Sequence, residues 1–183
     1  MNDKNLQTTV IGGGCFWCTE AIFQMVEGVE KVVSGYAGGS EDTADYKAVC
    51  SGLTNHAEVV EITFDPAVIN YEDLFKIFFT THDPTTLNRQ GADKGTQYRS
   101  VIFYQNEEEK ATAEKVMREY APQVWDDPVV TQLEPLEALY AGEQYHQNYY
   151  RKTGDRNPYC TVVITPKVAK FRKLFADRMK QGV

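Results

Sequence analysis

The chain lacks a long hydrophobic run and a surplus of positive charge, and both absences narrow its possible functions. Its longest apolar runs, such as residues 8–11 and 77–79, are far shorter than the roughly 18 residues that a membrane-spanning helix needs. No apolar signal segment follows the first five residues. The 19 Lys and Arg are outnumbered by 26 Asp and Glu, so the net charge of −7 disfavours binding to nucleic-acid phosphates. We therefore expect a cytoplasmic protein that binds neither membranes nor nucleic acid.

Internal repeats and low-complexity tracts are also missing from the sequence. With 183 residues, 42% hydrophobic and 25% charged, the chain has the composition of one folded domain rather than of a disordered protein. We therefore expect a single domain over residues 1–183, and a monomer. Two long loops are predicted, at residues 35–55 and 82–96, and loops of that length are uncommon unless they serve a site.

The hydrophobic pattern predicts strands and helices in the order βαββαβ, followed by a helix, a strand and a final helix. Expected strands are residues 8–12, 29–36, 57–64, 98–104 and 129–133. Expected helices cover residues 15–27 or follow the N-caps Asn70, Asn106 and Thr165, the last with Pro166 in its first turn. This order predicts an α/β (α+β) fold. It is that of a two-layer ferredoxin-like sandwich, a mainly antiparallel mixed sheet with helices packed on it and irregular loops.

Cysteine is scarce, with four residues at Cys15, Cys18, Cys50 and Cys160. A reducing compartment disfavours structural disulfides, so these thiols are expected to be catalytic, metal-binding or inert. At least one of them is therefore a candidate for chemistry.

Residues 12–18 carry the strongest functional signal in the chain. Three glycines precede Cys15 and allow a sharp turn and a close approach of the backbone to a ligand. A helix start at Cys15 would stabilise its thiolate and lower its pKa, which predicts a nucleophile. The neighbouring Phe16 and Trp17 could form a cage for a small apolar group beside the sulfur. The plain alternative is a glycine turn leading into core aromatics and an inert cysteine.

Other kinds of site fit this segment less well. It has neither the glycine pattern nor the Gly-Lys-Ser/Thr ending of a phosphate-binding loop, and Thr19 stands where a c-type haem site needs histidine. Zinc would need Cys15 and Cys18 to combine with scattered ligands, because no second close ligand pair exists. The ligands available are Cys50, Cys160, His56, His82 and His146. A non-catalytic zinc or redox-sensing domain is thus the alternative to an enzyme.

The motif Gly14-Cys15-Phe16-Trp17 resembles the catalytic motif of the peptide methionine sulfoxide reductase A family. Further blocks that resemble this family follow in family order at residues 35–39, 46–52, 55–58, 82–84, 88–93, 95–100 and 145–147. The resemblance implies a thiol-dependent enzyme that reduces the S epimer of methionine sulfoxide, free or in proteins, to methionine. One enzyme per sulfoxide epimer reverses methionine oxidation.

The resemblance also assigns the site residues. It makes Cys15 the nucleophile and Phe16 and Trp17 the methyl-binding aromatics. It makes Glu58 the acid, and Tyr46, Asp93 and Tyr98 the partners of the sulfoxide oxygen. The chemistry explains the set, because charge that develops on this oxygen makes it a poor leaving group unless it is protonated. A Glu58 buried near the two tyrosines would have a raised pKa and would stay protonated near neutral pH.

Taken singly, these residues have plainer interpretations. Glu58 could lie on the exposed face of its strand, the tyrosines could be structural, and Asp93 could be a turn residue. The three histidines, His56, His82 and His146, are expected to make ordinary hydrogen bonds and are left out of the catalytic set.

The resemblance leaves the recycling of the enzyme open between two cysteines. After oxygen transfer Cys15 would be a sulfenic acid, which a second thiol must convert to a disulfide. Cys160 resembles the resolving thiol of many family members and is narrowly favoured. Cys18 has a spacing that can close a disulfide, although the family often has glycine at its position. Cys50 is expected to be a small buried side chain. Thioredoxin is the implied reductant, and no metal or organic cofactor is expected.

Overall fold

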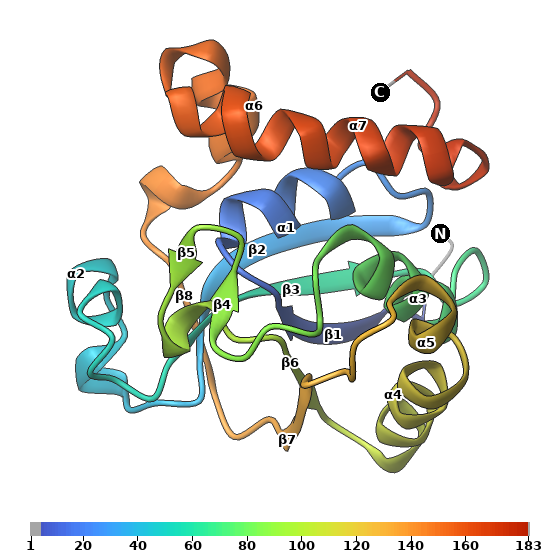
Figure 1. The fold of residues 1–183 in the computed structure, drawn as a ribbon, viewed down its shortest axis with the longest axis horizontal. Coiled ribbons are helices and arrows are strands. Elements are labelled where there is room, and N and C mark those ends of the chain that lie inside the picture. Colours follow the sequence, from blue (N-terminus) through green and yellow to red (C-terminus); the bar gives the residue numbers. More distant parts are fainter. Residues whose placement is uncertain (1–4, 183) are drawn as a thin grey trace.

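A six-stranded mixed sheet forms the centre of the computed structural model, which describes residues 5–182 (Figure 1). Its strand order is β7-β6-β1-β3-β2-β8. The four central strands are antiparallel to one another, and so is β8 to β2, whereas β7 at the other edge runs parallel to β6. The strands are β1 (Gln7–Gly12), β2 (Val29–Ala37), β3 (Ala57–Phe64), β6 (Val101–Tyr104), β7 (Gln132–Pro135) and β8 (Leu139–Ala141). The predicted mainly antiparallel mixed sheet is confirmed, with β8 as an additional edge strand.

Seven α-helices are described within residues 5–182. They are α1 (Phe16–Phe23), α2 (Tyr46–Cys50), α3 (Tyr71–Thr81), α4 (Glu107–Glu119), α5 (Ala121–Val124), α6 (Tyr149–Thr153) and α7 (Thr165–Leu174). Helix α1 packs on β2 and β3 and is itself covered by α7, so it lies between the sheet and α7 (Figure 1). No helix of the described part of the chain is long and apolar enough to cross a membrane.

Alternation along β3 decides which side chains enter the main core. Val60, Ile62 and Phe64 face the helices and join the large hydrophobic cluster. Ala57 and Val59 face the other side, where a smaller cluster is completed by Leu136 and Leu139. Successive side chains of a strand point to opposite faces, so Glu58 lies on the helix-covered face, in register with Val60.

The predicted N-caps of two helices are confirmed. The side chain of Asn70 accepts the backbone N–H of Asp73 at 2.8 Å, and that of Asn106 accepts the N–H of Glu109 at 2.8 Å. Each bond satisfies a donor that the first helical turn leaves unpaired. These caps fix where α3 and α4 begin.

The predicted start of the final helix is wrong. A π-helical turn, Cys160–Ile164, runs directly into α7, so the chain is already helical before Thr165. The Thr165 hydroxyl donates to the carbonyl of Cys160 at 2.9 Å instead of capping a helix start. Cys160 therefore belongs to a continuous helical segment.

The remaining differences from the prediction lie at loops and at the ends of elements. The helix expected over residues 15–27 is shorter, because α1 ends at Phe23. A 3-10 turn (Thr96–Tyr98) delays the expected strand at residues 98–104 until Val101, and the strand expected at residues 129–133 lies at Gln132–Pro135. The first predicted loop contains a 3-10 turn (Glu41–Thr43) and α2. The second contains a small antiparallel pair, β4 (Arg89–Gln90) and β5 (Asp93–Lys94). Both loops are thus folded segments with defined positions.

Candidate active site

Gly13 and Gly14 allow the turn before α1 to pack closely against the His82 ring. Gly14 has φ +94°, a conformation that other residues rarely adopt. A Cβ atom at Gly13 would lie 2.7 Å from Cδ2 of His82, closer than packed side chains allow. The His82 ring is buried and bonded to Ser100 Oγ at 2.7 Å, and burial lowers the pKa of His82 to about 3. A fixed, neutral ring therefore determines how closely Cys15 approaches the sheet.

Cys15 is the N-cap of α1, as the sequence predicts, and keeps 8% of its surface exposed. Its pKa is raised, chiefly by burial and then by the hydrogen bond to Cys18 and the charge of Glu58. The expectation of a lowered Cys15 pKa is therefore wrong for the substrate-free protein. The backbone N–H of Trp17, in the first turn of α1, lowers this pKa but does not offset the other effects. The neighbouring N–H of Phe16 donates to Glu58 Oε1 at 3.2 Å.

Glu58 is a buried acid directly beside the nucleophile candidate. Only 1% of its surface is exposed, which rules out the plainer interpretation that it lies on the solvent face of its strand. Burial raises the pKa of Glu58 to about 8, supported by the charges of Asp93 and Cys18 and opposed by the Phe16 N–H. A large share of the molecules therefore carries a protonated Glu58 at neutral pH, which is the state that can donate a proton.

Three further predicted residues come together around Glu58 from separate segments. Tyr46 begins α2, Asp93 begins β5, and Tyr98 ends the 3-10 turn before β6. Burial raises the pKa of both tyrosines, and the charge of Glu58 adds to the effect on each. Their hydroxyls therefore stay protonated and can donate hydrogen bonds. Asp93 Oδ2 accepts the hydroxyl of Tyr159 at 2.5 Å.

Phe16 and Trp17 form part of an aromatic cluster. The Phe16 ring is buried and lies 5.6 Å from that of Tyr36. The Trp17 indole stacks on Tyr149, with ring centroids 3.7 Å apart and planes 9° from parallel. Tyr159 approaches Trp17 edge-on at 6.0 Å. The two predicted cage residues thus lie within an apolar, aromatic environment.

The role of residues 143–159 at this site was not predicted, although residues 145–147 resemble a block of the family. His146 Nδ1 accepts the indole N–H of Trp17 at 3.1 Å, and Tyr149 and Tyr159 pack against the same ring. A second signal in the sequence was the density of tyrosines in residues 140–159, at Tyr140, Tyr145, Tyr149, Tyr150 and Tyr159. Such a run does not reveal which rings reach the site.

Cys18 and Cys160 lie near the nucleophile in different ways. The Cys18 sulfur accepts a hydrogen bond from Cys15 and lies 3.8 Å from the Tyr159 hydroxyl. The bond from Cys15 and the charge of Lys167 lower the pKa of Cys18 to about 7, against the effect of burial. Cys160 is buried, which raises the pKa of its thiol, and the charge of Cys18 adds to this effect. Cys18 therefore interacts with both of the other two thiols.

Cys50 and His56 do not belong to the cluster formed by Cys15, Cys18 and Cys160. Cys50 is exposed at the end of α2, so its predicted burial is wrong. His56 is held by the Gly39 N–H at 3.1 Å and the Ser40 carbonyl at 2.7 Å, the ordinary bonding expected for it. Over residues 5–182, no group of three or more His, Cys, Asp and Glu side chains is arranged to hold a metal ion.

The peptide methionine sulfoxide reductase family model matches residues 7–179. The chain belongs to this family. The MsrA of Saccharolobus solfataricus is 51% identical over 175 residues, 96% of this chain and 98% of that protein. The reduced form of Mxr1 from Saccharomyces cerevisiae has a TM-score of 0.77 at 35% identity, covering 85% of this chain and 89% of that one.

A second structure of the yeast protein shows it in complex with Trx2. This structure has a TM-score of 0.54 at 25% identity and covers 81% of this chain and 87% of that one. Membership of the family makes the protein a methionine sulfoxide reductase, an oxidoreductase that uses a redox-active cysteine.

Proposed function

We propose that the protein reduces the S epimer of methionine sulfoxide at Cys15, with Glu58 as the proton donor. The observation that carries this assignment is the Phe16 N–H to Glu58 bond of 3.2 Å, which holds a buried carboxyl beside the residue that bears the thiol. Phe16 and Trp17 would hold the substrate methyl group. Tyr46, Tyr98 and Asp93 would hold the sulfoxide oxygen.

The proposed chemical step transfers oxygen from one sulfur to another. The Cys15 sulfur attacks the sulfoxide, and Glu58 supplies a proton to the departing oxygen. A bond forms between the Cys15 sulfur and this oxygen as the substrate sulfur–oxygen bond breaks, so methionine leaves and Cys15 becomes a sulfenic acid. The substrate sulfur is reduced by two electrons, and the Cys15 sulfur is oxidised by two. The proton lost from the Cys15 thiol replaces the one that Glu58 gives.

We propose that Cys18 resolves the sulfenic acid and that Cys160 acts after it. The contact between the Cys15 and Cys18 sulfurs and the lowered Cys18 pKa support this order. Cys18 displaces water from the sulfenic acid and forms a disulfide with Cys15. The Cys160 thiolate then attacks Cys18, which frees Cys15 and leaves a Cys18–Cys160 disulfide. This order modifies the sequence-based preference for Cys160 as the first partner.

A thioredoxin is the proposed reductant of the final disulfide. The complex of yeast Mxr1 with Trx2 supports an external dithiol donor of this class. The donor reduces the disulfide, becomes a disulfide itself, and restores both thiols. We further propose that the chain needs no metal or organic cofactor, since all groups used in the cycle are its own side chains and the donor's thiols.

The finer fold assignment and the wider properties of the chain are also proposals. The antiparallel order β6-β1-β3-β2, with α1 on one face, supports a ferredoxin-like sandwich. One large core that includes residues of α1, α3, α4 and α7 supports a single domain over residues 1–183. Four free cysteines fit a cytoplasmic location. We propose a monomer, which size-exclusion chromatography with light scattering would test.

Reduction of separated sulfoxide epimers tests the proposed function. With dithiothreitol as reductant, the wild-type protein should convert peptide-bound S-sulfoxide to methionine and leave the R epimer unchanged. Cys15→Ser should abolish the reaction, and the matched Cys50→Ser variant should retain it. Full turnover by Cys15→Ser would disprove the assignment. Stoichiometric zinc in the reduced, inactive protein would instead favour the metal-binding alternative.

A further inference from the structure

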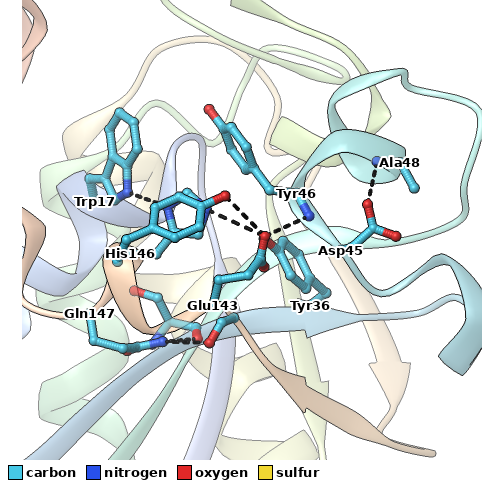
Figure 2. Close-up of polar contacts among 11 residues, drawn as sticks. Trp17, Tyr36, Asp45, Tyr46, Ala48, Glu143, His146 and Gln147 are labelled. Carbon is cyan, nitrogen blue, oxygen red and sulfur yellow. Dashed lines mark hydrogen bonds and ion pairs between the residues drawn. The ribbon is translucent and has the colours of Figure 1, made fainter.

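Glu143 joins three segments of the molecule through its carboxylate. It lies between β8 and the 3-10 turn Gln144–His146, and its side chain is half-buried. Figure 2 shows it at the centre of a polar cluster. Its oxygens accept the Tyr36 hydroxyl from β2 at 2.9 Å and the backbone N–H of Tyr46 from α2 at 3.1 Å. They also accept the Tyr145 hydroxyl at 3.1 Å.

All these partners are donors, so a carboxylate suits this position. An ionised carboxyl only accepts hydrogen bonds, whereas a carboxamide would turn an NH₂ group toward at least one of the donors. Burial alone would raise the pKa of Glu143, but the donors around it together hold that pKa below its usual value. Glu143 is therefore ionised at neutral pH.

His146 connects Glu143 to the substrate cage. The imidazole is fully buried, and burial lowers its pKa, which keeps the ring neutral near pH 7. Indole N–H is only a donor, so the 3.1 Å bond from Trp17 requires an unprotonated Nδ1. The proton of the neutral ring is therefore on Nε2. This Nε2 has no hydrogen-bond partner within the described residues, and Glu143 Oε2 lies 4.0 Å from it.

We propose that Glu143 is a positioning residue for sulfoxide binding. Its carboxylate favours the Nε2–H form of His146, which holds the Trp17 indole, and the same carboxylate holds the N–H of Tyr46 at the start of α2. One side chain thus sets the distance between the methyl-binding wall and an oxygen-binding hydroxyl. This inference rests on the roles proposed above for Trp17 and Tyr46.

The packing around these groups supports this coupling. The His146 ring centroid lies 4.4 Å from that of Tyr46 and 5.7 Å from that of Trp17, and these two rings stack on each other at 6.4 Å, so the three rings contact one another. It also lies 5.0 Å from Phe16. A change in the orientation of this ring must therefore be felt by both cage aromatics and by Tyr46, because closely packed side chains do not move independently.

Nuclear magnetic resonance of the wild-type protein tests the first step without turnover. Long-range ¹H–¹⁵N spectra should show His146 neutral at pH 7 with its proton on Nε2, and the Trp17 indole N–H should resonate downfield, as a hydrogen-bonded donor does. A proton on Nδ1 of His146 would overturn the proposal. This readout is independent of whether the protein reduces sulfoxides, so its failure is distinguishable from failure of the proposed function.

The variant Glu143→Gln tests the second step. We expect the Trp17 indole resonance to move toward the position of an unbonded indole, while that of Trp125, which donates to the Phe79 carbonyl at 2.7 Å, stays unchanged. We expect kcat/KM for the S-sulfoxide to fall about tenfold, within the range for leaving buried donors unsatisfied. The matched control Glu137→Gln, an exposed residue between β7 and β8, should change neither quantity.

Two further results decide the case. An unchanged Trp17 resonance and an unchanged kcat/KM in folded Glu143→Gln would overturn the proposal. If that variant does not fold, Glu143→Asp keeps the acceptors on a shorter side chain. The proposal then requires a smaller shift of the Trp17 resonance in the same direction, and an unshifted resonance would overturn it.

Discussion

The inner and outer walls of the site are built by different means. The inner wall holds Glu58 within β3 and Cys15 three residues after the end of β1. The two strands are paired through a continuous ladder that ends by matching Ile11 with Val60. The outer wall, residues 143–160, reaches the site through side-chain hydrogen bonds and ring stacking. Backbone ladders hold the reacting groups rigidly, whereas a wall held by side chains can yield to a substrate. Chemistry and substrate fit are therefore expected to respond to different substitutions.

A buried acid attaches the outer wall to the inner one. Glu20 of α1 is buried and accepts the N–H groups of Asn148 and Tyr149 at 3.0 and 3.1 Å. Asn148 adopts a left-handed conformation with φ 57°, and its Oδ1 accepts a bond from Gln24 at 2.6 Å. The helix that carries Trp17 thus also fixes the backbone that presents Tyr149 to it.

The largest effect should come from removing the acid of the inner wall. For Glu58→Gln we expect the single-turnover rate of sulfoxide reduction to fall by more than about tenfold, in line with the 10²–10⁴ contribution of general acids. The loss should be largest below pH 8, where wild-type Glu58 is protonated. Rapid-quench measurement of methionine would check this, with Glu61→Gln on the same strand as control. Equal rates in wild type and Glu58→Gln would remove Glu58 from the chemical step.

The free energy of unfolding should also depend on pH because Glu58 is buried. Because the folded-state pKa of Glu58 is raised from 4.5 to about 8, its contribution to stability is fully present below pH 4.5 and is lost as pH rises through 8. Relative to Glu58→Gln, the wild type should lose on the order of a few kcal/mol of unfolding free energy over this interval. Urea unfolding at several pH values would measure the difference. Parallel stability curves would contradict the burial of an ionisable carboxyl here.

The disulfides formed during recycling should show whether Cys18 or Cys160 reacts first with the Cys15 sulfenic acid. After one equivalent of sulfoxide, Cys160→Ser should stop at a Cys15–Cys18 disulfide. Cys18→Ser should keep the Cys15 sulfenic acid for more than about ten times longer than wild type, since its neighbouring thiol is missing. Mass spectrometry after dimedone trapping would identify these species, with Cys50→Ser as control. A Cys15–Cys160 disulfide formed at the wild-type rate in Cys18→Ser would disprove the order.

The smallest of these effects is expected at the outer wall. Tyr149→Ala removes the ring stacked on Trp17 and should raise KM about 2- to 12-fold, corresponding to 0.5–1.5 kcal/mol for an aromatic pair. The single-turnover rate at saturating substrate should change little. Tyr150→Ala is the matched control, because the Tyr150 hydroxyl bonds to Thr165 instead. A reduced chemical rate with unchanged KM would place Tyr149 with the inner wall.

The inner wall could be predicted from the sequence because the resemblance to the family implies the roles of Cys15 and Glu58, and local periodicity agrees with it. Alternation in residues 57–64 places Glu58 on the core face with Val60, and the glycines before Cys15 mark the helix start. The outer wall could not be predicted in this way. His146 and Tyr149 contact Trp17 across more than 120 positions of sequence, and Glu143 lies beside His146. No local pattern encodes contacts over such distances.

Two errors show where local rules fail. The Thr165-Pro166 pair fits a helix start, yet the preceding segment is already helical through a π turn that propensities do not anticipate. The lowered pKa expected for Cys15 followed from the helix start alone, whereas burial, the hydrogen bond to Cys18 and the charge of Glu58 outweigh the Trp17 N–H in the folded chain. Both outcomes depend on packing, which only the complete fold defines.

Because Gly13 has no side chain, the site is sensitive to any substitution at this position. With Cδ2 of His82 at 2.7 Å from where a Cβ would stand, even alanine must displace either the histidine ring or the start of α1. The histidine is anchored at Ser100, so the yielding part is the strand-to-helix corner that carries the sulfur. The substitution Gly13→Ala introduces no polar atom and lies two residues from Cys15, yet it would move the Cys15 sulfur away from Glu58. Screens for inactive alleles should find this position as readily as the cysteine itself.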